Sequence, residues 1–160
     1  MTKDFFKDLC TDKTLEAEGA WVYLPDFEGS VKVARWGNPK YQQALTAQLK
    51  PYRRYGDKRG GWKPDTPESV KKEAERITAS VTAEHILLDI KDFYADGRPI
   101  ENTVENKTRM LIEDDFFAQV QEAASYRETF RAEEREEEAK NSKKPSAGGS
   151  TTPPETRKAS

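Results

Sequence analysis

The sequence predicts an α+β fold that is mainly α-helical, with an N-terminal β-hairpin packed on a small helical bundle and a disordered C-terminal tail. Two β-rich runs near the start flank a turn that contains Pro, Asp and Gly. Downstream segments carry apolar residues every three to four positions, which is the period of an α-helix. Residues 142–160 contain no large apolar side chain, so nothing there offsets the entropy lost on ordering.

The composition lies between that of a compact domain and that of a disordered chain. The 160 residues are 34% hydrophobic and 35% charged, and the mean hydropathy is −0.97. The net charge is only −2, and three Trp, six Tyr and seven Phe can bury large areas, so we expect one small domain. No apolar run approaches the roughly 18 residues of a membrane span, and the first residues do not resemble a signal peptide. We therefore expect a soluble, intracellular protein.

The charged residues are segregated along the chain and divide it into three parts. Residues 1–64 form a basic, aromatic-rich part with 12 Lys or Arg against 8 Asp or Glu, and they contain all three Trp. Residues 65–141 form an acidic helical part with 11 Lys or Arg against 20 Asp or Glu. Residues 142–160, the tail, hold 4 Lys or Arg and one Glu. This asymmetry indicates a surface that meets a charged partner, or contacts between the chain's own segments.

A short helix and a hairpin are expected at the N-terminus. Residues 4–10 predict the helix because Phe5, Phe6, Leu9 and Cys10 share one helical face. Residues 19–24 and 30–36 predict the two strands, joined by a turn at residues 25–29. Val31 and Val33 point to one face of this hairpin and Lys32 to the other. A lone hairpin is marginally stable in water, so its apolar face must pack on the helices that follow.

Two longer helices come next, each behind a start signal. Asn38 suits the N-cap and Pro39 the first helical position, while Pro51 limits the end of this helix. Its apolar positions are Tyr41, Leu45, Leu49 and Tyr52. Thr66-Pro67-Glu68 repeats the start signal for a helix from 67 to about 88. Residues 86–88 alternatively form a short buried strand.

Two further helices complete the domain. After a turn at residues 96–99, Asn102 and Glu105 form an analogue of a capping box ahead of Val104, Thr108, Leu111 and Ile112. The last helix begins near Asp114, where acids suit the positive helix end, and extends beyond Phe130. Its apolar stripe consists of Phe116, Phe117, Val120, Ala123, Ala124 and Phe130. Beyond Phe130 only charged pairs support the helix, so we expect a solvated arm that is free to dock elsewhere.

Residues suited to catalysis or metal binding are scarce. His85, the single histidine, is expected to be a partly exposed helix residue, and Cys10 a small packing residue. Neither of the glycine-rich phosphate-binding signatures occurs. The acids at 114–115 and 133–138 are typical of solvated helix faces. We therefore expect no enzyme, no cofactor and no metal site.

Residues 50–63 form the most distinctive local pattern, with six Lys or Arg, one Asp and three aromatic residues. Nucleic-acid surfaces combine these residue types, because cations neutralise phosphate and aromatic rings stack on bases. Two other interpretations remain open. The segment docks on the chain's own acidic part, or it docks on an acidic protein partner.

Residues 86–140 resemble the tail assembly chaperones of long-tailed bacteriophages in the order and spacing of several short motifs. These motifs are Ile-Leu-Leu-Asp-Ile at 86–90, Asp-Gly-Arg-Pro-Ile at 96–100, Glu-Asn at 105–106, Leu111, Asp-Asp-Phe-Phe at 114–117 and Phe-Arg-Ala-Glu-Glu at 130–134. Residues 31–35, 37–41 and 50–54 resemble the front half of some members, so the resemblance covers about 110 residues. Ile90 stands where many members carry Trp.

The resemblance implies a non-catalytic chaperone that binds the tape measure protein, a long helix-rich chain, and helps to recruit tail tube subunits. It implies action in the host cytoplasm during assembly, absence from the mature virion, no cofactor and no membrane partner, and it is compatible with self-association. An apolar helix face can serve such a partner in a helix-in-groove mode, although the same residues alternatively pack their own core. The candidate partner-binding residues are Phe116, Phe117, Val120, Phe130, Tyr52, Arg53 and Arg54.

The alternative function is that of a small nucleic-acid-binding phage protein that uses residues 50–63. It predicts an affinity that falls steeply as the salt concentration rises. The resemblance favours the protein partners over nucleic acid.

Overall fold

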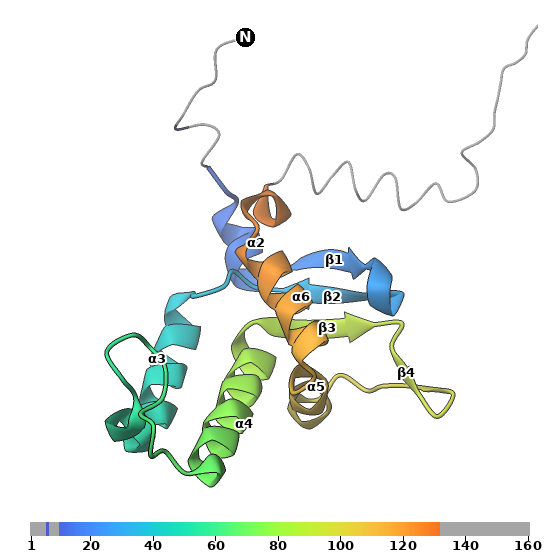
Figure 1. The fold of residues 1–160 in the computed structure, drawn as a ribbon. Helices are drawn as coiled ribbons and strands as arrows, with labels where there is room; N and C mark the ends of the chain where they lie inside the picture. Colours follow the sequence, from blue (N-terminus) through green and yellow to red (C-terminus); the bar gives the residue numbers. More distant parts are fainter. Residues whose placement is uncertain (1–5, 7–9, 132–160) are drawn as a thin grey trace, which may run out of the picture.

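The computed structural model describes Phe6 and residues 10–131, and it has the α+β class that the sequence predicts (Figure 1). The predicted helix at 4–10 lies mostly outside these residues. So do the predicted charged arm beyond Arg131 and the predicted tail at 142–160. Cys10 is exposed, so its prediction as a packing residue is wrong.

The elements follow one another with short connections. The helices are α2 (Lys13–Glu18), α3 (Pro39–Leu49), α4 (Glu68–His85), α5 (Val104–Leu111) and α6 (Asp114–Ser125). The strands are β1 (Ala20–Leu24), β2 (Gly29–Val33), β3 (Leu87–Lys91), β4 (Tyr94–Ala95) and β5 (Arg98–Pro99). Three 3₁₀ turns, η1 (Pro25–Phe27), η2 (Lys50–Tyr55) and η3 (Arg127–Phe130), complete the described part.

The main sheet is antiparallel in the order β1-β2-β3, and its first two strands are the predicted hairpin. Val22, Val31 and Ile90 are neighbours across the three strands. Helix α4 ends at His85, so the predicted extension to residue 88 is wrong and the alternative of a buried strand is confirmed. Residues 87–91 form a strand because they pair with β2, and this pairing gives the hairpin the third strand that it lacks by itself.

The core lies between the sheet and the helices that cover one of its faces. Helix α6 crosses this face, while α3 and α4 lie side by side beyond the sheet and α5 packs against α4 (Figure 1). Val31, Val33 and Val120 are fully buried where α6 meets β2. The opposite face of the sheet carries residues that are half-buried or exposed, namely Trp21, Tyr23, Ser30, Lys32, Asp89 and Lys91.

The predicted N-cap of α3 is confirmed, and the predicted N-cap of α5 is wrong by one residue. The Asn38 side chain accepts a hydrogen bond from the backbone N–H of Tyr41 at 3.0 Å, as expected of an N-cap. The cap of α5 is Thr103, whose hydroxyl accepts from Asn106 N–H at 3.0 Å. Asn102, the predicted cap, instead donates its side-chain amide to the Leu88 carbonyl at 3.3 Å.

The predicted continuous last helix stops at Ser125, so its extension through Phe130 is wrong. Tyr126 is extended, and η3 then turns the chain so that Phe130 is fully buried. The Phe130 carbonyl accepts from Asp12 N–H at 2.7 Å, and the Arg35 guanidinium lies 5.5 Å from the centre of the Phe130 ring. A straight helix would carry Phe130 away from these contacts, and the burial of a large ring outweighs one more turn of helix.

Candidate partner-binding groove

Three of the four predicted partner-binding residues on the last helical stripe lie in the core. Phe116, Val120 and Phe130 are between 0% and 3% exposed. Phe116 makes edge-to-face contacts with Phe27 and Phe93, with ring centres 5.3 Å and 5.6 Å apart. These three side chains stabilise the domain and offer no surface to a partner in this fold.

Phe117 has a different environment from its neighbour Phe116. It is only partly buried, and its ring meets Trp36 edge-to-face at 5.9 Å. Phe117 lines a groove together with Tyr52 and Arg53, two other predicted partner-binding residues. Arg54 lies outside this lining, where its guanidinium packs over the Tyr55 ring at 4.9 Å and donates to the Tyr55 hydroxyl.

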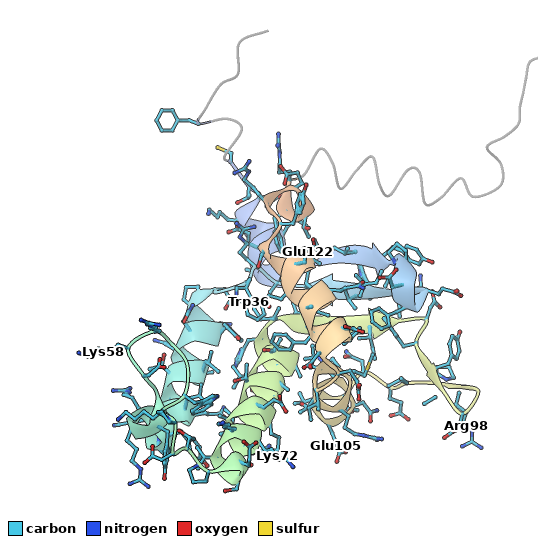
Figure 2. All side chains as sticks on the ribbon, in the orientation of Figure 1. Trp36, Lys58, Lys72, Arg98, Glu105 and Glu122 are labelled. Atoms are coloured by element: carbon cyan, nitrogen blue, oxygen red, sulfur yellow. The ribbon has the colours of Figure 1, made fainter. Side chains whose placement is uncertain are left out.

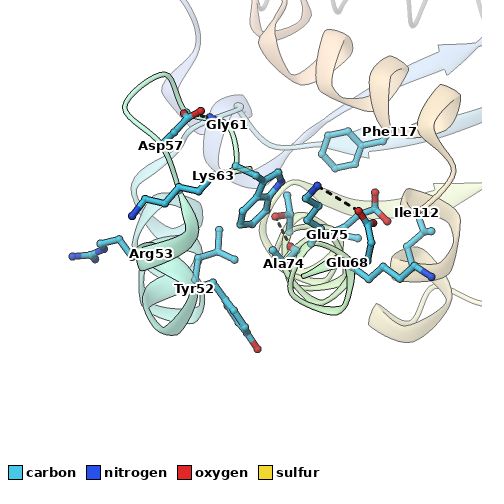
Figure 3. Close-up of a pocket in the computed structure, with 18 of the residues that line it drawn as sticks. Tyr52, Arg53, Asp57, Gly61, Lys63, Glu68, Ala74, Glu75, Ile112 and Phe117 are labelled. Carbon is cyan, nitrogen blue, oxygen red and sulfur yellow. Dashed lines mark hydrogen bonds and ion pairs between the residues drawn. The ribbon is translucent and has the colours of Figure 1, made fainter. Parts of the chain in front are cut away.

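The groove has a volume of about 1460 Å³ and runs along α4 (Figure 3). Small residues of α4, Ala74, Thr78 and Ala79, lie on its floor and leave space that larger side chains would fill. Tyr52 and Trp62 come from one wall, and Ile112 and Phe117 come from the other. Trp62 remains 39% exposed and Ile112 41% exposed, so the groove keeps unusually apolar walls open to solvent.

Charges of both signs line the groove. The cations are Arg53, Lys58, Lys63, Lys71 and Lys72, and the anions are Asp57, Glu68, Glu75 and Asp114. One pair is internal to α4, where Lys71 Nζ lies 3.4 Å from Glu68 Oε1 (Figure 3). A lining with nearly equal numbers of acids and bases suits a protein partner better than a polyanion.

Asp57 organises the loop that presents Trp62. Its carboxylate accepts backbone hydrogen bonds from Arg59 N–H at 2.9 Å and Gly61 N–H at 2.7 Å. Gly60 has a φ of +85°, a left-handed conformation that glycine adopts without steric cost. The Asp-x-x-Gly-Gly sequence therefore closes the loop locally, in the manner of an Asx turn. A bridge between Gly56 and Trp62 completes it.

The cations of the segment 50–63 have no ionic partner in the part of the chain that the structure describes. Lys50, Arg53, Arg54, Lys58, Arg59 and Lys63 are exposed, and none lies within 4.0 Å of a described carboxylate oxygen. Within the segment, Tyr52 packs against the core, and Tyr52 and Trp62 line the groove that runs along α4. The segment therefore lies beside α4 of the acidic part through its aromatic residues and without a described ion pair.

Sequence reasoning missed the role of Lys107. This side chain is 5% exposed, and its Nζ donates to the carbonyls of Leu87 at 2.8 Å and Leu88 at 3.3 Å. Burial lowers the pKa of Lys107, and the Asp89 carboxylate partly opposes this shift. The sequence held one signal for the burial of Lys107. It lies four residues before Leu111, so the two side chains share one face of the helix, and Leu111 is buried.

Potential metal-ligating side chains do not cluster in the described residues. No group of three or more His, Cys, Asp or Glu side chains gathers there in a metal-binding arrangement. The His85 side chain is 23% exposed at the end of α4, as predicted, and its Nε2 lies 3.9 Å from Glu84. Within the same residues, no helix is both long enough and apolar enough to cross a bilayer.

Comparison with known proteins identifies one family. The family model described as YdaY prophage protein matches residues 36–141, which include both walls and the floor of the groove. No curated protein and no solved structure matches the chain. The matched region exceeds half of the chain, and the protein belongs to the phage-derived YdaY prophage protein family.

Proposed function

We propose that this prophage protein is a tail assembly chaperone that binds the tape measure protein without catalysing a reaction. In this role it keeps the tape measure soluble in the host cytoplasm, helps to recruit tail tube subunits and leaves before the virion is mature. The phage family and the resemblance of residues 86–140 to tail assembly chaperones support the proposal. The observation that carries it is the open apolar groove along α4.

The groove suits one face of an amphipathic helix. Its floor of small residues lets another backbone approach α4, and Trp62 and Ile112 offer apolar contacts on either side. The charged lining gives hydrogen-bonding and ionic contacts to the polar edges of such a helix. Burying these exposed apolar side chains contributes roughly 25 cal/mol for each Å² removed from water. A long helix-rich chain offers many segments of this kind.

Co-expression with the tape measure protein of the same prophage tests the proposal. We expect the tape measure to remain soluble and to elute with this protein. The double variant Trp62→Ala with Ile112→Ala should lose the complex while it keeps its helical content. Tyr94→Ala is the matched control, since Tyr94 is 62% exposed on β4 and does not line the groove. An insoluble tape measure with the wild-type chain, and no eluting complex, would remove the proposal.

Nucleic-acid binding is the second candidate, and the six exposed cations of the segment 50–63 favour it. Random duplex DNA at low salt is a suitable probe. Binding should fall steeply with salt, and Arg53→Ala with Arg54→Ala should weaken it for all sequences. Failure of the wild-type chain to bind DNA at low salt would eliminate this candidate.

A further inference from the structure

The six cations of the segment 50–63, named here the basic loop, form a surface rich in positive charge that makes no ion pair with a described carboxylate. They are Lys50, Arg53, Arg54, Lys58, Arg59 and Lys63. Figure 2 shows Lys58 at the outer edge of the domain, on the loop that follows α3. Like charges this close raise the electrostatic free energy of the surface, and an anionic partner lowers it.

A segment of opposite charge lies in the same sequence. Residues 133–138 read Glu-Glu-Arg-Glu-Glu-Glu and hold five of the 20 acids of residues 65–141. This acidic run begins two residues after Arg131, the last residue that the structure describes. The remaining 15 acids belong to residues 65–131, where none pairs with the basic loop.

The described chain ends just after η3, which is remote from the basic loop (Figure 1). Phe130 packs under Arg35, and the adjacent Ala34 N–H donates to the Ile86 carbonyl, so Phe130 lies near the C-terminal end of α4. The basic loop is tied to the opposite end, where the Thr66 hydroxyl donates to the Lys63 carbonyl at 2.7 Å. The 18 residues of α4 separate these ends by roughly 27 Å.

This separation exceeds the reach of the start of the acidic run. Three residues lead from Phe130 to Glu133 and eight lead to Glu138. Even a fully extended chain spans at most about 3.5 Å per residue, hence about 10 Å and 28 Å. The side chains of a Glu and of a Lys or Arg extend this reach by several Å, so the acids at 136–138 meet the basic loop of their own copy only on a nearly extended chain, and Glu133 does not reach it. A second copy can meet the whole run.

We propose that the acidic run of one copy docks on the basic loop of a second copy. The two surfaces differ, so the contact is heterologous and leaves a free basic loop at one end and a free acidic run at the other. Further copies add at both ends, which produces a row of molecules. Lys50, Arg54 and Arg59 of the basic loop lie outside the groove lining, so the contact extends beyond the surface of the proposed function, although Arg53, Lys58 and Lys63 belong to both surfaces.

Sedimentation velocity on the full chain measures this association. We expect species larger than a monomer at roughly 50 mM salt and monomers at roughly 500 mM, because salt screens the contact. Arg54→Glu with Arg59→Glu should be monomeric at both salt concentrations. Lys91→Glu with Arg98→Glu is the matched control, since it makes the same charge change at exposed residues far from the basic loop and should still associate.

A charge-swap mixture identifies the two surfaces. Glu136→Lys with Glu137→Lys and Glu138→Lys should also be monomeric when alone. Mixed with the Arg54→Glu, Arg59→Glu chain, it should associate again, because each chain then supplies the surface that the other has lost. Either of two results would overturn the proposal. One is a wild-type chain that does not associate at low salt, and the other is a mixture that stays monomeric.

Isotope-labelled cross-linking separates docking between copies from docking within one copy. A carbodiimide joins a Lys amine to a Glu carboxylate that it contacts, and light and heavy chains are mixed before the reaction. We expect light–heavy pairs that join Lys58 or Lys63 to residues 133–138. Pairs found only within light or only within heavy chains contradict the proposal. Trp62→Ala should leave these pairs unchanged, so the result is independent of tape measure binding.

Discussion

Lys107 Nζ lies 2.8 Å from the Leu87 carbonyl oxygen and joins helix α5 to the edge of the sheet. The strand β3 has β2 on one side only, so its outer carbonyls lack a neighbouring strand. Lys107 and Asn102 supply side-chain donors to Leu87 and Leu88 along this edge. Lys107 lies in the region that the family model matches. Its side chain therefore completes the hydrogen bonding at the outer edge of the sheet.

Lys107→Met should lower the free energy of unfolding by about 1–3 kcal/mol. The substitution keeps the length of the side chain but leaves the buried Leu87 carbonyl without its donor, and an unsatisfied buried acceptor costs about this much. Urea denaturation measures the change. Arg109→Met on the same helix is exposed and should change stability by less than about 0.5 kcal/mol. Equal stability of the Lys107→Met and wild-type chains would show that the donor is dispensable.

The contribution of Lys107 to stability should rise with pH in the alkaline range just below the ordinary lysine pKa of 10.5, whereas Tyr41, whose pKa burial raises, makes an opposite contribution. Burial lowers the pKa of Lys107 in the folded state, and Asp89 only partly restores it. Between the folded and unfolded pKa values the unfolded state therefore binds more protons, so raising the pH favours folding. Denaturation at a series of pH values should show this rise as the difference between the wild type and Lys107→Met. A rise of the same size in Lys107→Met would assign it to other groups.

Glu16 should contribute stability that is lost in acid. Burial raises the pKa of Glu16, but hydrogen bonds from Thr11 and Lys13 and the charges of Lys13 and Arg35 lower it, with a net decrease from 4.5. A lowered carboxyl pKa stabilises the fold above the unfolded value of 4.5, and this contribution disappears as the pH falls through the folded pKa.

Glu16→Gln should therefore cost about 1 kcal/mol at neutral pH and have little effect below the folded pKa of Glu16. Thermal unfolding followed by circular dichroism between neutral pH and acid measures the difference. Glu18→Gln, an exposed neighbour on α2, is the control. A cost that is the same at every pH would contradict the assignment to the carboxylate charge.

Asp57→Ala should weaken the proposed binding of the tape measure protein about tenfold or more with little loss of global stability. The carboxylate accepts from Arg59 and Gly61 N–H and thereby shapes the loop that presents Trp62. Without it the loop samples other conformations, and ordering it costs free energy when the partner binds. Titration of a tape measure fragment gives the affinity, and denaturation checks the fold. Unchanged affinity would show that the loop conformation does not matter for the partner.

Local signals determined much of this fold directly from the sequence. The hairpin of β1 and β2 follows from two β-rich runs and a turn, and the start of α3 follows from Asn38 and Pro39, because both depend on neighbours a few residues away. The composition of the segment 50–63 left three interpretations open, namely nucleic acid, the chain's own acidic part and an acidic protein partner, and the structure places Tyr52 and Arg53 in the lining of a groove.

Tertiary contacts decided the remaining features. The short apolar run after His85 fits a helix or a strand equally well, and its pairing with β2 makes it a strand. Phe130 leaves the helical stripe because Arg35 and α2 offer it a buried site that no periodicity reveals. The groove itself joins Trp62, Ala74 and Ile112 from separate elements. A sequence pattern reports the preferences of neighbouring residues, whereas these outcomes depend on the packing of residues that are distant along the chain.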